Sequence, residues 1–123
     1  MLDASALLAL LNVEPGSSVV SGLAQSAAIS SVNWCEVFGR LRAAGVDGDA
    51  LRTQMAETGI AVVPFDGIDA EAAGEFVPRT RRQGLSLADR ACLALAARLG
   101  VPAVTADRAW TTLDVGVAVV CIR

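Results

Sequence analysis

Four acidic residues lie where the chain could build a binding site for a divalent cation. Each stands at the end of a predicted strand or in the first turns of a predicted helix; they are Asp3, Glu36, Asp89 and Asp107. Carboxylates gathered in one place repel one another, and each raises the pKa of its neighbours. A divalent cation removes that repulsion, and carboxylates with a few water molecules are the usual ligands of Mg²⁺ and Mn²⁺. The four acids together therefore indicate a candidate metal site.

Each acid also has an ordinary structural explanation. Asp3 and Asp107 precede predicted helices and could act as N-caps. Ser86 and the acid three residues later fit the capping box S-x-x-[DE]. Glu36 could pair with Arg40 one turn further along the same helix, in the favourable orientation. Caps and surface pairs are more common than metal ligands, so only the occurrence of all four acids favours the metal.

The residue types that the chain lacks narrow the chemistry further. It contains no His, Lys or Tyr, which excludes Ser/His/Asp and Cys/His catalysis, a lysine Schiff base and a P-loop lysine. A signalling receiver domain, another parallel sheet with acids at strand ends, is disfavoured because it needs a lysine. Cys35, Cys92 and Cys121 are widely spaced with no CxxC pair, so we expect buried free thiols. Polar chemistry must therefore rest on Asp, Glu, Arg, Ser, Thr or Asn.

The elements that must position the acids alternate between strands and helices. Short apolar strand signals cover residues 1–4, 27–31, 60–66, 102–107 and 117–122. Helical patterns cover residues 5–12, 18–26, 32–45, 47–59, 68–84, 85–100 and 108–113, with Pro78 breaking or fraying the fifth. Apolar strands separated by helices predict an α/β fold with a central, mainly parallel sheet of four to five strands. Ligands of such sheets bind beyond the carboxyl ends of the strands, where these acids are expected.

Length and composition predict one domain over residues 1–123. The chain is 54% hydrophobic, its mean hydropathy is +0.52, and no repeat or linker divides it. No apolar run reaches the roughly 18 residues that a membrane span requires. The first residues lack the basic segment of a signal peptide, so we expect a cytoplasmic protein with no membrane partner.

Four segments resemble, in their order along the chain, the motifs of the PIN domain and specifically of the VapC toxins of bacterial toxin–antitoxin pairs. They are "LDASALLALL", "SSVNWCEVFGRL", "LSLADRACLALAARLG" and "AVTADRAW", followed by the terminal "VAVVCIR". The resemblance covers essentially the whole chain. It implies a three-layer fold and an endoribonuclease that hydrolyses RNA with water activated by one or two Mg²⁺ or Mn²⁺ ions. It also leaves open a PIN nuclease of RNA processing, or a module that binds RNA or a partner without cutting.

The resemblance assigns roles to individual residues. It places the catalytic, metal-binding acids on Asp3, Glu36, Asp89 and Asp107, and supporting polar positions on Ser5, Asn33 and Thr105. Two departures concern the short first strand, with only two residues before Asp3, and Trp110, which stands where some relatives have a further acid. These departures leave the number of metal ions open.

Candidate contacts with RNA rest on arginine alone. The net charge of −3 turns slightly positive once the four acids are neutralised by metal, and arginine suits both phosphates and unpaired bases. The candidates are Arg79, Arg81, Arg82, Arg90 and Arg108. Their alternative role is that of a solvated helix end, or of partners for neighbouring acids.

One apolar stripe has two interpretations. Trp34, Phe38 and Leu41 recur at helical spacing, which favours packing in the core. The resemblance adds a groove that receives the helix of a VapB-like antitoxin, to which the "LLALLN" segment can contribute. A homodimer is expected from the resemblance as well.

Overall fold

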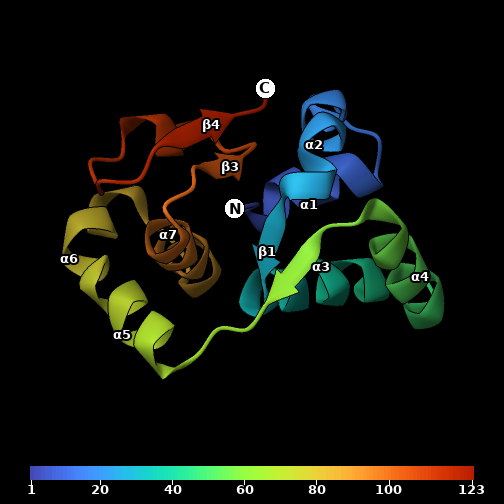
Figure 1. Cartoon of the computed structure of the whole chain (residues 1–123), viewed down its shortest axis with the longest axis horizontal. Coiled ribbons are helices and arrows are strands. Elements are labelled where there is room, and N and C mark those ends of the chain that lie inside the picture. Colours follow the sequence, from blue (N-terminus) through green and yellow to red (C-terminus); the bar gives the residue numbers. More distant parts are fainter.

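Short parallel strands form the centre of the molecule. The computed structural model describes all residues from 1 to 123 (Figure 1). β1 (Ala28–Ser30) pairs in parallel with β2 (Ala61–Val63), and β3 (Ala103–Thr105) pairs in parallel with β4 (Val119–Cys121). The predicted parallel strands are therefore confirmed, although each is only three residues long.

Leu2 joins the two ladders. It forms parallel bridges to Ile29 of β1 and to Val104 of β3, so the order across the molecule is β2, β1, Leu2, β3, β4. The predicted first strand is thereby reduced to a single bridging residue, because Asp3 already begins the following helix as its N-cap. This arrangement puts Asp3 at the carboxyl edge of the sheet, between β1 and β3.

Helices connect and flank these strands, as the alternating pattern predicts. Their bounds are α1 (Ala4–Leu11), α2 (Ser17–Leu23), α3 (Ser31–Ala43), α4 (Gly48–Thr58), α5 (Gly67–Glu75), α6 (Val77–Thr80) and α7 (Leu87–Leu99), with 3₁₀ turns η1 (Ala24–Ser26), η2 (Arg81–Gln83) and η3 (Arg108–Thr112). The predicted helix over 68–84 is thus three pieces. Pro78 lies in the first turn of α6, where its missing N–H costs no helical hydrogen bond.

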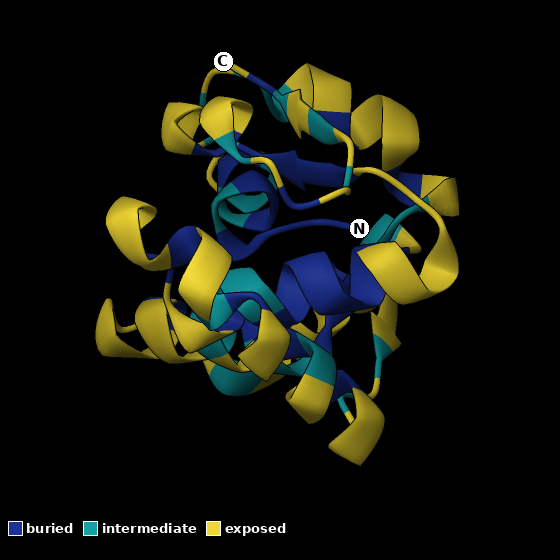
Figure 2. Ribbon diagram, turned by 90° about the vertical axis from the view of Figure 1, so that its left-hand side faces the viewer, coloured by how far each residue is buried: buried dark blue, intermediate teal, exposed yellow.

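The two faces of the sheet pack against different helices. Leu2 and Val104 belong to a core shared with α1, α2, α3 and α4, whereas Met1 and Ala103 belong to a core shared with α5, α7 and η3. Adjacent residues therefore serve opposite faces, as the two-residue period of an extended chain requires. Buried residues gather in the centre of the ribbon and exposed residues in its outer helices (Figure 2). The result is a helix layer on each side of the sheet.

An ion pair fixes α5 to α7. Arg98 donates from Nε to Asp69 Oδ1 at 2.7 Å and from Nη2 to Oδ2 at 3.1 Å. Asp69 is 1% exposed, and the bidentate contact gives this buried carboxylate a charged partner. The pair holds α7, whose first turn carries Asp89, against the rest of its layer.

No helix of the structure combines the length and the apolar composition that a membrane span needs.

The turn between α1 and α2 packs tightly against the chain end. Gly16 has φ +93°, and a Cβ atom there would lie 2.8 Å from the carbonyl oxygen of Ile122. A side chain at this position would meet both backbone strain and steric overlap.

We expect Gly16→Ala to lower the free energy of unfolding by about 2 kcal/mol or more, because the left-handed conformation and the overlap both penalise a Cβ. Urea denaturation measures the change. Gly22→Ala is the matched control, since Gly22 lies within α2 with nothing within 4 Å of the added Cβ. The control should be neutral or gain up to about 1 kcal/mol of helix propensity. Equal stability of Gly16→Ala and the wild type would contradict the packing of this turn.

Candidate metal centre

The carboxylate of Asp3 is the most enclosed of the four acids. Asp3 is 4% exposed and follows Leu2 at the carboxyl edge of the sheet. Its Oδ2 accepts hydrogen bonds from the backbone N–H and the hydroxyl of Ser5, and from the Thr105 hydroxyl at 3.0 Å. Its Oδ1 has only the amide nitrogen of Asn33, at 3.5 Å, beyond the range of a good hydrogen bond. One carboxylate oxygen is thus saturated and the other is nearly free.

Asp107 is linked to Asp3 through the same hydroxyl groups. The backbone N–H of Asp107 donates to Thr105 Oγ1 at 3.0 Å, and Ser5 Oγ accepts from the N–H of Ala106 at 2.9 Å. The exposed carboxylate of Asp107 itself caps η3 by accepting from the N–H of Ala109 at 2.8 Å. The strand end that carries Asp107 is therefore fixed to Asp3, while its carboxylate performs a local role.

Asp89 opens α7 as half of a capping box. Its Oδ2 accepts from the N–H of Ser86 at 2.6 Å, and Ser86 Oγ accepts from the N–H of Asp89 at 3.1 Å. Asp89 is also close enough to Asp3 for its charge to act there. Burial is the main cause that raises the pKa of Asp3, hydrogen bonds from Ser5 and Thr105 oppose the rise, and the charge of Asp89 adds to it.

A buried thiol lies beneath these two acids. Cys92 lies one turn after Asp89 and is fully buried, and burial followed by the charge of Asp3 raises the pKa of its thiol well above the usual value. It is therefore neutral at physiological pH. The expectation that all three cysteines are buried is wrong for Cys35, which is exposed, and for Cys121, which is partly exposed. Cys35 lies on the outward side of α3, where helix periodicity alone does not distinguish the faces of a small residue.

Glu36 makes a different kind of contact from the other acids. It lies on α3 one turn after Asn33, but its Oε1 lies 2.6 Å from Nη2 of Arg40. No hydrogen bond of Glu36 reaches Asp3, Asp89 or Asp107. The structure therefore links the strand end of Asp107 to Asp3 by hydrogen bonds, places the charge of Asp89 near Asp3, and pairs Glu36 with an arginine of its own helix.

The residue types suit a divalent cation, but their side chains do not yet surround a single point. No three acids or cysteines stand close enough together to hold a metal ion. The carboxylates of Glu36, Asp89 and Asp107 are each engaged in the local contacts described above. Hard oxygen donors are nevertheless unused at the centre of the set, because Asn33 Oδ1 is buried without a partner beside the loosely held Oδ1 of Asp3. This donor set suits Mg²⁺ or Mn²⁺, provided that the engaged carboxylates rotate toward Asp3.

The five candidate RNA-binding arginines differ in their contacts. Arg79 donates to the carbonyl of Asp114 at 2.8 Å, and Arg108 donates to the carbonyl of Arg123 at 3.2 Å. Arg90 follows Asp89 and is held by the carbonyl of Leu85, with its Nε buried and unpartnered. The other two, Arg81 and Arg82, are exposed on η2.

The predicted apolar stripe of α3 divides between core and surface. Leu41 is buried in the core, whereas Trp34 and Phe38 are partly exposed, with ring centroids 5.5 Å apart at an edge-on angle. The guanidinium of Arg52 stands 5.4 Å from the centroid of the Phe38 ring. A partner on this surface would therefore contact Trp34 and Phe38, with Leu41 beneath them.

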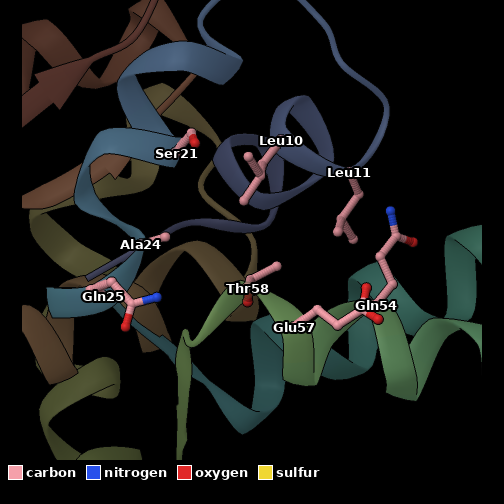
Figure 3. Close-up of a pocket in the computed structure, with 8 residues that line it drawn as sticks. All are labelled: Leu10, Leu11, Ser21, Ala24, Gln25, Gln54, Glu57 and Thr58. Atoms are coloured by element: carbon pink, nitrogen blue, oxygen red, sulfur yellow. The ribbon is translucent and has the colours of Figure 1, made fainter.

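A separate pocket of about 400 Å³ lies between α1, α2 with η1, and α4 (Figure 3). Its lining consists of Leu10, Leu11, Ser21, Ala24, Gln25, Gln54, Glu57 and Thr58. Leu10 and Leu11 belong to the "LLALLN" segment, but none of the residues of the α3 stripe lines this pocket. The two surfaces are therefore distinct in this structure.

Comparisons with known proteins agree on the fold. The family model of the PIN domain matches residues 1–115. A toxin–antitoxin complex from Klebsiella pneumoniae matches with a TM-score of 0.73 and 21% identity, over 99% of this chain and 96% of the matched chain. DNA-bound VapBC from Salmonella typhimurium matches with a TM-score of 0.71 and 19% identity, over 100% and 97%. VapBC2 from Rickettsia felis, bound to a promoter DNA fragment, matches with a TM-score of 0.65 and 14% identity, over 98% and 96%. A search among curated proteins finds no significant match.

The raised pKa of Asp3 predicts a pH-dependent difference between Asp3→Asn and the wild type without metal. The folded wild type holds a proton at pH values where the unfolded chain has lost it, so its stability falls as the pH rises through the folded-state pKa. Asparagine does not ionise and remains a good N-cap. We therefore expect the variant to gain stability relative to the wild type between acidic and neutral pH, measured by urea denaturation in EDTA. Asp114→Asn, at an exposed acid, is the control. A pH-independent difference for Asp3→Asn would contradict the burial argument.

Proposed function

The chain belongs to the PIN domain family, and from this premise we propose that it is a VapC-type endoribonuclease that hydrolyses RNA in a reaction dependent on Mg²⁺ or Mn²⁺. The observation that carries the proposal is the buried carboxylate of Asp3, which has one free oxygen and the charge of Asp89 nearby. An unbalanced negative charge in the interior is costly, and a bound cation offsets that cost.

Four acids would hold the cation, in the roles that the family resemblance gives them. In this proposal Asp3 would be the central ligand, and Glu36, Asp89 and Asp107 would join it from α3, from the start of α7 and from the segment after β3. A bound divalent cation lowers the pKa of a coordinated water and neutralises charge that develops on the phosphate. One or two ions can serve this purpose.

The remaining polar residues would orient these ligands. Ser5 and Thr105 donate to a single oxygen of Asp3 and so direct the other oxygen toward the shared site. Asn33 approaches that second oxygen from α3. Arg90 follows Asp89 in the sequence and, like the other four candidate arginines, would contact a phosphate of the RNA. The chain's residues thus supply position and charge, without an acid–base histidine.

We also propose a protein partner, an antitoxin of the VapB kind that blocks the nuclease, and a homodimer as its functional form. Two of the structural relatives are described as VapBC bound to DNA and a third as a toxin–antitoxin complex. Partly exposed Trp34 and Phe38 offer an aromatic surface for an apolar helix.

Cleavage of RNA by the purified chain tests the nuclease proposal. We expect cleavage with Mg²⁺ or Mn²⁺, loss of cleavage in EDTA, and a loss of at least about a hundredfold in Asp3→Asn and Asp89→Asn, because each removes a metal ligand. Gel analysis of a labelled RNA measures the rate. Asp114→Asn removes the same charge from an exposed position near the chain end and should cleave at the wild-type rate. Full activity of Asp89→Asn, or cleavage that persists in EDTA, would contradict the shared-metal site.

The antitoxin surface predicts a hot spot at Trp34. Trp34→Ala should weaken the complex with the product of a neighbouring antitoxin gene at least about tenfold, since a partly exposed tryptophan is a typical anchor of an interface. Isothermal titration calorimetry measures the dissociation constant. Val62→Ala, at an exposed position on β2, should bind within about twofold of the wild type. Unchanged binding by Trp34→Ala would exclude this surface.

A further inference from the structure

Glu36 differs from the other three candidate ligands in its partner. Asp3, Asp89 and Asp107 accept hydrogen bonds from backbone N–H or hydroxyl groups, whereas Glu36 forms an ion pair with a full positive charge, Arg40. The Glu36 side chain is 28% exposed and the Arg40 side chain is 62% exposed. The pair is therefore partly enclosed at the carboxylate and open at the guanidinium.

The spacing along α3 puts Arg40 two turns from Asn33, which contacts Asp3. Asn33, Glu36 and Arg40 follow one another at intervals of about one turn along one side of the helix. Asn33 reaches Asp3, so Glu36 lies one turn away from the centre of the site and Arg40 two turns away. Glu36 can thus turn inward toward Asp3 or outward toward Arg40, but one carboxylate cannot satisfy both well.

We propose that Arg40 is a built-in competitor for the divalent cation at Glu36. In the metal-free chain it neutralises Glu36 and holds the carboxylate outward, and it must release Glu36 when the cation binds. This inference rests on the proposed function, because it concerns the same four acids. Its consequence is a weaker affinity for metal than the acids alone would give, set by a residue that is not itself a ligand.

The size of the effect follows from the exposure of the pair. Breaking an exposed pair spaced by four residues changes an equilibrium by about twofold. Repulsion between the guanidinium and the divalent cation adds to this, with solvent screening most of it. We therefore expect removal of the Arg40 charge to tighten metal binding by about three- to tenfold.

Isothermal titration of Mn²⁺ into the purified full chain tests the proposal. Arg40→Gln should lower the dissociation constant by about three- to tenfold, whereas Arg40→Lys, which keeps the charge and the spacing, should remain within about twofold of the wild type. Arg42→Gln is the matched control: Arg42 lies on the same helix, is exposed, and binds the carbonyl of Val46 at 2.9 Å instead of an acid. It should change the dissociation constant by less than about twofold.

The same substitutions in a Glu36→Gln variant separate the effect of the Glu36–Arg40 ion pair from the effect of removing a positive charge. In Glu36→Gln the ion pair no longer exists, so adding Arg40→Gln should tighten Mn²⁺ binding less than it does in the wild-type background, leaving only the general repulsion between the guanidinium and the cation. Equal effects of Arg40→Gln and Arg42→Gln in the wild-type background would overturn the proposal while leaving the metal site standing. A wild-type chain that binds no Mn²⁺ and cleaves no RNA would overturn both this proposal and the nuclease function.

Discussion

Asp3 carries a carboxylate into the interior at the one place where both halves of the sheet meet, and much of the structure serves to accommodate it. Leu2 bridges β1 and β3, so the next residue must emerge between the carboxyl ends of these strands. There the N-terminus of α1 begins, and the hydroxyl groups of Ser5 and Thr105 satisfy one carboxylate oxygen. Burial still raises the pKa of Asp3, so the compensation is incomplete. A bound cation would offset the remaining cost of burying the negative charge of Asp3.

Capping and metal binding need not be alternatives in this architecture. In a parallel sheet covered by helices, each helix that follows a strand starts near the carboxyl edge, with its N–H groups facing that edge. An acid that caps such a helix is therefore already at the rim where a ligand would bind. Asp3 caps α1, Asp107 caps η3, and Asp89 completes the capping box at the start of α7, so each acid combines a local capping contact with its proposed role as a ligand. Glu36 lies further along its helix and has an ion pair in place of a cap.

Features that depend on neighbouring residues could be predicted from the sequence. Apolar periodicity and glycine ends predicted the order of strands and helices, and short spacings predicted the Ser86–Asp89 capping box and the Glu36–Arg40 pair. Local spacing could not predict the hydrogen bonds that position Asp3, because Thr105 lies 102 residues further along the chain. A family resemblance suggested which polar residues matter, but not which oxygen of Asp3 each one contacts. The Asp69–Arg98 pair had no local signal at all, since the two residues lie 29 positions apart on different helices.

A crystal of the protein grown with Mn²⁺, with the ion located by its anomalous scattering, would show directly whether Asp3 binds the cation. We expect an ion bonded to Oδ1 of Asp3, with Asp89 and Asp107 nearby and Glu36 released from Arg40. An ion bound only at the surface, with Asp3 Oδ1 still free and Glu36 still paired with Arg40, would contradict this expectation.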